Sequence, residues 1–234
     1  MPLDLGVMAF ADLAARLDQV RTTIAQSQLR AGLSHDVRIV AVTKTHGIDA
    51  VREARRAGLH AVGENRVQEA LAKMDAAADV DVEWHLIGTL QTNKARHAAG
   101  RFALVHSLDR VELATALGRR VAPGSRQAVL VQVNCSGEPQ KGGVEPEGLE
   151  RLLAAVQAIA ELEARGLMTL AEFTEDPVVQ RRAFRLLREL RDGAASRGYA
   201  LPELSMGMSG DYAVAVEEGA TMLRLGTALF GPRE

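Results

Sequence analysis

The feature that most restricts the fold of this chain is a regular alternation of short apolar, β-branched runs with longer stretches of helical periodicity. Eight such runs follow residue 36, and they span 37–43, 61–63, 82–88, 103–107, 128–133, 165–169, 203–206 and 222–226. The helical stretches between them include 49–57, 67–74, 110–121, 147–160, 178–195 and 212–218. Strands separated by helices predict a parallel sheet, because parallel neighbours require a crossover connection.

Eight strand–helix units in a chain of 234 residues match the size of a compact TIM barrel. The competing fold is an open doubly wound sheet, in which a G-x-G-x-x-G turn follows the first strand. Here the first run ends in Thr43-Lys44-Thr45-His46 instead. We therefore expect an α/β protein with a single (β/α)8 TIM barrel, as one domain over residues 1–234.

A helix is expected before the first strand. Between about Met8 and Ala31 apolar residues recur near helical spacing, at Phe10, Leu13, Leu17, Val20, Ile24 and Leu29. Gly32 follows this stretch and is the residue type that ends helices. We expect residues 1–32 to form an extra N-terminal helix that packs on the barrel.

Composition excludes several classes of partner. The 28 basic and 30 acidic residues leave a formal net charge of −2, with no basic surplus to bind nucleic acid. Cys135 is the single cysteine, and no Cys/His cluster has the spacing of a metal site, so no metal is expected. No apolar stretch reaches about 18 residues, and the N-terminus lacks a secretory signal. We expect a soluble, cytoplasmic protein without membrane contact, and a monomer.

Polar residues follow the predicted strands at their carboxyl ends, which is where TIM barrels build their active sites. Seven of the eight runs end in or near such residues, namely Lys44, Glu64-Asn65, Gln91-Thr92-Asn93-Lys94, His106-Ser107-Leu108-Asp109, Asn134-Cys135-Ser136, Ser205-Met206-Gly207-Met208-Ser209 and Arg224-Leu225-Gly226-Thr227. Solubility alone does not explain this convergence, so it indicates a binding site at one mouth of the barrel.

Lys44 is the first candidate, because it follows an apolar strand and should lie at the inner rim of the barrel. Partial desolvation lowers the pKa of an amine, which is what a lysine needs to attack an aldehyde. The alternative is a lysine that extends to water or pairs with Glu64. Position alone leaves both interpretations open.

The last two strands supply candidates for anion binding. Ser209, Gly226 and Thr227 offer hydroxyl and backbone N–H groups where many barrels bind a phosphate, although an ordinary glycine-containing turn is the alternative. Arg224 shares the inner face with Gly226 by strand alternation, and a buried arginine requires a partner. On the third strand we expect His85 to point inward, either as a ligand contact or as a core histidine.

Four other histidines, His46, His60, His97 and His106, show no paired spacing, and we interpret them as solvated or structural. We expect Cys135 to be a small buried apolar residue.

Together these segments resemble the YggS/PROSC family of pyridoxal 5′-phosphate (PLP)-binding proteins, also called PLP homeostasis proteins. The resemblance covers nearly the whole chain after the first helix. It rests on many segments in one order, among them Ala41-Val42-Thr43-Lys44, Gly63-Glu64-Asn65-Arg66, Trp84-His85-Leu86-Ile87-Gly88-Thr89, His106-Ser107-Leu108-Asp109, Leu204-Ser205-Met206-Gly207-Met208-Ser209-Gly210-Asp211 and Arg224-Leu225-Gly226-Thr227-Ala228-Leu229-Phe230-Gly231.

The resemblance implies a barrel like that of alanine racemase, the type III PLP fold, with PLP held as a Schiff base on Lys44. It implies that Ser209, Gly226 and Thr227 hold the phosphate and that Arg224 faces the pyridine nitrogen. It also places three further residues around the ring: Asn65, His85 and Asn134. One departure is visible, because Gly142-Gly143 follows Lys141 where a small polar residue is expected.

Two hypotheses from different classes follow. In the first, the chain is a PLP carrier or regulator with no catalytic residue assigned, and PLP-dependent apoenzymes are candidate acceptors of the cofactor. A permanently charged guanidinium at the ring nitrogen disfavours ring protonation, which weakens PLP as an electron sink and favours this reading. In the second, the chain is a small amino-acid racemase or a Schiff-base aldolase in which Lys44 attacks the substrate.

Overall fold

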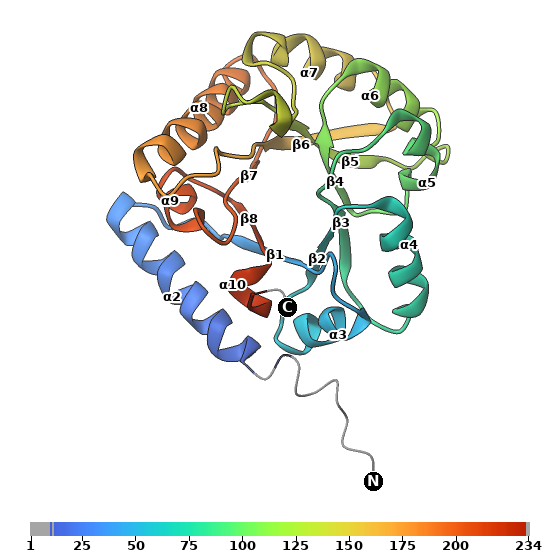
Figure 1. The fold of residues 1–234 in the computed structure, drawn as a ribbon. Coiled ribbons are helices and arrows are strands. Elements are labelled where there is room, and N and C mark those ends of the chain that lie inside the picture. Colours follow the sequence, from blue (N-terminus) through green and yellow to red (C-terminus); the bar gives the residue numbers. More distant parts are fainter. Residues whose placement is uncertain (1–9, 11, 233–234) are drawn as a thin grey trace.

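The computed structural model describes residue 10 and residues 12–232 of the chain. Eight parallel strands follow one another around a closed barrel in the order β1 to β8, and β8 pairs with β1. Helices surround this barrel, as the view along its axis shows (Figure 1). The (β/α)8 barrel expected from the alternating pattern is therefore confirmed.

The strands lie where the apolar runs predicted them, with ends that shift by at most three residues. They are β1 (Arg38–Val42), β2 (Ala61–Glu64), β3 (Glu83–Leu86), β4 (Leu104–Leu108), β5 (Gln127–Gln132), β6 (Leu162–Met168), β7 (Glu203–Ser205) and β8 (Met222–Leu225). The α-helices of the structure are α2 (Leu13–Ala31), α3 (Ile48–Arg56), α4 (Val67–Ala76), α5 (Ala95–Ala98), α6 (Val111–Gly118), α7 (Leu149–Gln157), α8 (Pro177–Ala195), α9 (Tyr212–Glu217) and α10 (Thr227–Phe230). Short 3-10 turns lie at Thr92–Lys94, Pro139–Lys141 and Pro146–Gly148.

The apolar core has two parts, because each buried strand has two faces. The larger part lies between the strands and the surrounding helices and includes the fully buried Leu113, Leu153 and Phe184. The smaller part is a separate cluster of six side chains from six strands, Val40, Ala61, Leu104, Leu130, Met168 and Met222. Strand alternation places this second cluster inside the barrel.

Helix α2 confirms the predicted N-terminal helix but begins later, at Leu13, and residues 10 and 12 lie in a turn before it. It ends at Gly32, whose φ of 66° is the left-handed conformation that glycine adopts readily. Four of the predicted apolar positions are buried (Leu13, Leu17, Val20, Ile24). Leu29 is 82% exposed, so its expected place on the buried face was wrong. Residues 8, 9 and 11 of the predicted helix lie outside the described part of the chain.

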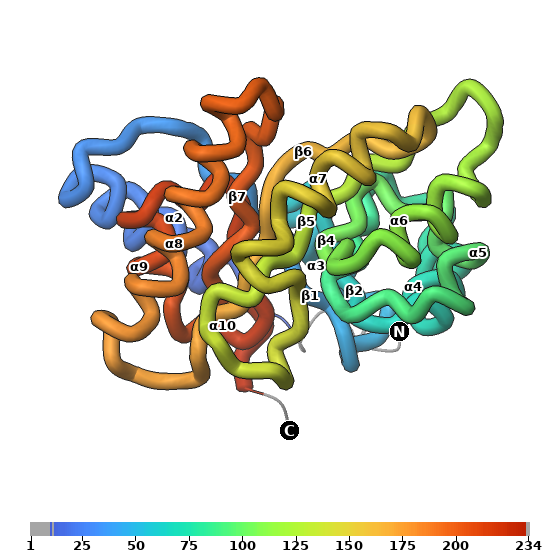
Figure 2. Tube along the Cα trace, turned by 90° about the horizontal axis from the view of Figure 1, so that it is seen from above, coloured from blue at the N-terminus to red at the C-terminus, as the bar shows by residue number. Residues whose placement is uncertain are grey.

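The loops that follow the strands gather at one end of the barrel, at the lower edge of Figure 2. The long connections after β5 and β6 and helix α10 lie at this end, while the links after α2, α6 and α8 lie at the other. Within the described residues, no helix combines the length and the apolar character needed to cross a lipid bilayer.

Candidate functional site

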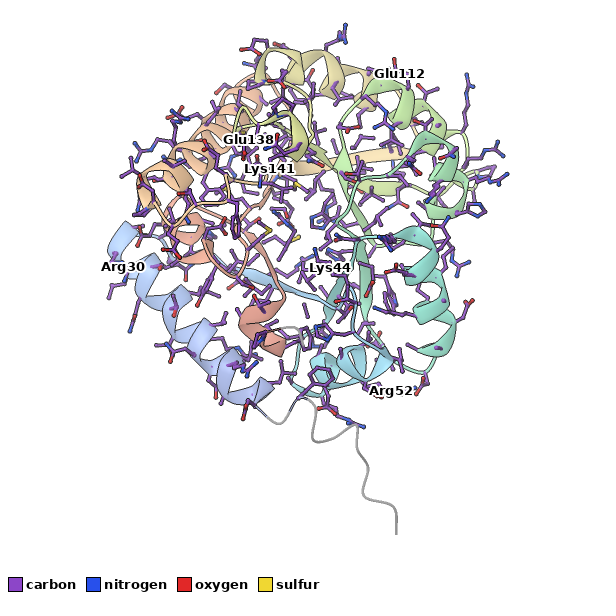
Figure 3. The ribbon with its side chains drawn as sticks, in the orientation of Figure 1. Arg30, Lys44, Arg52, Glu112, Glu138 and Lys141 are labelled. Atoms are coloured by element: carbon purple, nitrogen blue, oxygen red, sulfur yellow. The ribbon has the colours of Figure 1, made fainter. Side chains whose placement is uncertain are left out.

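Lys44 lies in a tight turn directly after β1. The His46 N–H donates to the Thr43 carbonyl at 3.1 Å, so Lys44 and Thr45 occupy the two central positions of the turn. Thr45 has a φ of 69°, a value that suits the third position of a type II turn but is rare for a β-branched residue. Lys44 is half-buried at the opening of the barrel (Figure 3). The chain thus accepts an unfavourable backbone conformation next to this lysine.

The turn rests on a buried ion pair behind the sheet. Glu64, at the end of β2, is fully buried, and its Oε1 accepts hydrogen bonds from Thr43 Oγ1 at 2.6 Å and Lys73 Nζ at 2.7 Å. Lys73 of α4 also donates to the Thr43 carbonyl at 2.8 Å. Glu64 therefore pairs with Lys73, whereas the sequence had left a pair between Glu64 and Lys44 open.

The ends of β7 and β8 are joined through Ser209. Its Oγ accepts hydrogen bonds from the Gly226 N–H at 3.3 Å and the Ala228 N–H at 3.0 Å. A hydroxyl that accepts twice still holds its own hydrogen, which it can donate to a ligand. Gly226 precedes α10 and Thr227 opens it, so the structure brings Ser209, Gly226 and Thr227 together.

Arg224 is buried in the barrel at 3% exposure. Its Nη1 donates to Ser205 Oγ at 2.6 Å and its Nη2 donates to the Thr169 carbonyl at 2.8 Å. Burial lowers the pKa of Arg224 to about 10, while the Asp211 carboxylate acts in the opposite direction. A guanidinium has five N–H donors, so these two bonds fix its position and leave donors for a ligand.

His85 and His106 lie side by side in the interior. The two residues are 1% and 0% exposed, and His85 Nδ1 lies 3.0 Å from His106 Nε2. Sequence reasoning missed this partner, because it looked for paired histidines along the chain. The signal was available in space: both residues stand on the inner face of neighbouring strands, β3 and β4.

The two predicted asparagines have different surroundings. Asn134 is buried, and its side chain bonds Glu145, Ser136 and the Gly137 N–H, all within the loop after β5. Asn65 is half-buried after β2. Its backbone lies so close to Gly88 that a Cβ added to Gly88 would be 2.3 Å from the Asn65 carbonyl oxygen.

The structure also explains the Gly142-Gly143 departure. Gly143 has a φ of 107°, and a Cβ there would lie 2.7 Å from the Asn134 nitrogen. The chain returns at this point over the end of β5, where Val144 pairs with Val133. Glycine is therefore required, since any side chain would collide with the strand. The same loop carries Lys141 across the barrel opening from Lys44 (Figure 3).

The other single-residue expectations have clear outcomes. Cys135 is buried, and burial raises the pKa of its thiol to about 11, which agrees with an inert apolar role. His106, expected to be solvated or structural, is buried and hydrogen-bonded. Among the residues that the structure describes, no group of three or more His, Cys, Asp or Glu side chains could hold a metal ion.

Comparisons with known proteins agree with this arrangement. Residues 15–234 match the profile of the alanine racemase N-terminal domain family. The PLP homeostasis protein of Aquifex aeolicus is 46% identical over 223 residues, which cover 94% of this chain and 97% of that protein. PipY of Synechococcus elongatus, solved with PLP bound, is 37% identical with a TM-score of 0.81, and the match covers 94% of this chain and all of PipY.

A more distant structure supports the fold alone. Alanine racemase of Clostridium difficile is 15% identical with a TM-score of 0.74, over 95% of this chain and 56% of the racemase. Sequence, fold and coverage thus point to one assignment. The chain belongs to the pyridoxal phosphate homeostasis protein family, whose barrel is that of the alanine racemase N-terminal domain.

Proposed function

We propose that this protein binds PLP at the mouth of its barrel, as a Schiff base on Lys44, and serves intracellular PLP homeostasis. The observation that carries the proposal is that three chemical groups stand on β8 or directly after β1, β7 and β8, strands that pair side by side in the barrel. They are the amine of Lys44 after β1, the hydroxyl and backbone donors around Ser209 after β7 and β8, and the guanidinium of Arg224. PLP supplies, when bound, an aldehyde, a phosphate and a pyridine nitrogen, one for each of these groups.

The donors after β7 and β8 suit a phosphate. Ser209 Oγ accepts two backbone N–H groups and keeps its own O–H for an anionic oxygen. The Gly226 N–H holds Ser209 Oγ in place, and Thr227 adds its hydroxyl and its backbone N–H at the start of α10. Asn65, His85 and Asn134 complete the proposed set around the ring.

Arg224 favours a carrier over an enzyme. A guanidinium is a donor in every protein and keeps its charge, so it holds the ring nitrogen as an acceptor without giving it a proton. A carbanion formed next to the cofactor then gains little stabilisation. We infer that the cofactor is stored and passed on, with PLP-dependent apoenzymes as its acceptors.

Several finer statements belong to the same proposal. We also propose that the protein acts in the cytoplasm as a monomer, and that the chain forms one barrel domain with helix α2 (Leu13–Ala31) packed on it. Sedimentation of the loaded and unloaded protein would test the oligomeric state.

The first prediction concerns Lys44. The purified protein mixed with PLP should absorb in the visible range, and borohydride reduction followed by peptide mapping should place the pyridoxyl group on Lys44. Lys44→Ala should lose the absorbance and remain folded, because a half-buried side chain at the rim contributes little to the core. Lys141→Ala is the matched control, since Lys141 lies across the same opening (Figure 3).

Pyridoxyl found on Lys73, Lys94 or Lys141, but not on Lys44, would overturn the assignment. The racemase alternative has its own measurement, the exchange of the α-proton of L- and D-alanine in deuterated water. Exchange at about 1 s⁻¹ or faster, an ordinary enzymatic rate, would favour the racemase over the carrier.

A further inference from the structure

Four buried polar side chains form one continuous chain of hydrogen bonds across the barrel interior. Arg224 Nη1 of β8 lies 2.6 Å from Ser205 Oγ of β7, which lies 2.9 Å from His106 Nδ1 of β4. His106 Nε2 then lies 3.0 Å from His85 Nδ1 of β3. All four residues are at most 3% exposed. These contacts join β8 to β3 beside the apolar cluster inside the barrel.

The chemistry of the donors gives this chain a direction. A guanidinium can only donate, so Ser205 Oγ accepts from Arg224 and can turn its own hydrogen toward His106 Nδ1. His106 then carries its proton on Nε2 and donates it to His85 Nδ1. The proton of His85 consequently lies on Nε2, which is 3.6 Å from the Glu83 Oε2 carboxylate oxygen.

The opposite direction is unfavourable at its His85 end, because it would place a bare lone pair on His85 Nε2. That nitrogen is buried without a hydrogen-bond partner and faces a carboxylate, so a lone pair there would be repelled. A hydrogen on the same atom is attracted to Glu83 instead.

Both histidines are held neutral, as this direction requires. Burial lowers the pKa of His85 to about 4; Glu83 opposes this shift and Arg38 adds to it. Burial lowers the pKa of His106 well below its ordinary value, and His85, Arg224 and Arg38 act in the same direction. Arg224 is thus held by two neutral acceptors, Ser205 Oγ and the Thr169 carbonyl, and keeps its charge for a ligand.

We propose that Ser205 and His106 are positioning residues that hold the Arg224 guanidinium against the ring nitrogen of PLP, as an oriented hydrogen-bond chain that ends on His85. The inference deepens the proposed function and rests on it, because Arg224 matters here as a partner of the cofactor ring. Without the serine hydroxyl, one of the two bonds that fix the guanidinium is lost, and the guanidinium can rotate away from the ring.

The direction of the chain can be tested without cofactor. Long-range ¹H–¹⁵N spectra of the full-length protein at pH 7.5 report the tautomer of each of the six histidines. His85→Gln and His106→Gln variants assign the two signals. We expect both residues to be neutral with the proton on Nε2. Ser205→Ala should change the signals of His106, its direct partner, more than those of His85. A proton on Nδ1 of His106, or a charged ring, would overturn the proposed direction.

The positioning role is tested with PLP bound. Ser205→Ala should shift the pH midpoint of the visible absorbance band and weaken PLP binding roughly tenfold, the loss expected for one hydrogen bond to a charged group. Ser205→Thr keeps the hydroxyl and should restore the wild-type midpoint. His106→Leu and His106→Asn form a second pair, because Asn can accept from Ser205 and Leu cannot. An unchanged midpoint in both Ser205→Ala and His106→Leu would refute the role.

Failure of the proposed function has a different signature. If the wild-type protein binds no PLP, the proposed function is refuted. The tautomers of His85 and His106 would still decide whether the oriented hydrogen-bond chain exists. If the protein binds PLP on Lys44 but its spectra do not change in the Ser205 and His106 variants, the proposed function stands and the positioning role of these two residues is refuted.

Discussion

His85 and His106 are buried as neutral side chains, so their titration makes the stability of the protein depend on pH under acidic conditions. In an unfolded chain a histidine has a pKa near 6.5, whereas burial lowers that of His85 to about 4 in the folded protein. Between pH 6.5 and pH 4, His85 is therefore mostly protonated in the unfolded chain and mostly neutral in the folded protein. The stabilisation is fully present above pH 6.5 and is lost as the pH falls toward 4.

We predict that the free energy of unfolding falls by roughly 3 kcal/mol between pH 6.5 and pH 4 because of His85 alone, in addition to other groups. The groups that face it are His106, Glu83 and Arg38. Urea unfolding of wild type and His85→Gln over this range measures the effect. The variant should show the shallower pH dependence, and His97→Gln, at an exposed position, should not. Equal slopes in wild type and His85→Gln would contradict the prediction.

Between elements, the buried pair of Glu64 and Lys73 joins β2, α4 and the turn that carries Lys44. Lys73→Met would leave the fully buried carboxylate of Glu64 without its cation. Breaking such a pair by removing one partner costs about 3–5 kcal/mol. We expect that loss in urea unfolding of Lys73→Met.

The matched control for this second prediction is Arg66→Met. Arg66 also lies by α4 and pairs with Glu69, but the two side chains are 76% and 41% exposed, so its removal should change stability little. The double variant Lys73→Met/Glu64→Leu should recover part of the loss, since no buried charge remains. A single variant as stable as Arg66→Met would show that water reaches Glu64.

At the scale of elements the sequence predicted more than at the scale of contacts. Strand positions followed from apolar runs, because a strand covered on both faces must be apolar along its length. The partnership of His85 and His106 did not follow, since it depends on how the inner faces of β3 and β4 align. The need for glycine at position 143, where a small polar residue was expected, also did not follow from the sequence. Its close approach to Asn134 exists only after the loop has folded back.

At the scale of the whole molecule, the proposed ligand connects the two ends of the chain, since Lys44 follows β1 and Ser209 and Gly226 follow β7 and β8. PLP at about 100 times its dissociation constant should stabilise the protein by about 2.7 kcal/mol, which raises Tm by roughly 5–10 °C. Pyridoxal, which lacks the phosphate, should raise Tm far less at the same concentration. Differential scanning calorimetry with both compounds measures this, and equal shifts would contradict the phosphate assignment.

The pairing of β8 with β1 also has a consequence for synthesis in the cell. A ribosome delivers β1 before β8, so the barrel cannot close while β8 is still inside the exit tunnel. Lys44 leaves the tunnel before the donors around Ser209 and Gly226. Until those donors emerge, a nascent chain has the amine without the rest of the pocket. Unfinished copies should leave the cellular PLP pool untouched, and only finished protein draws on it.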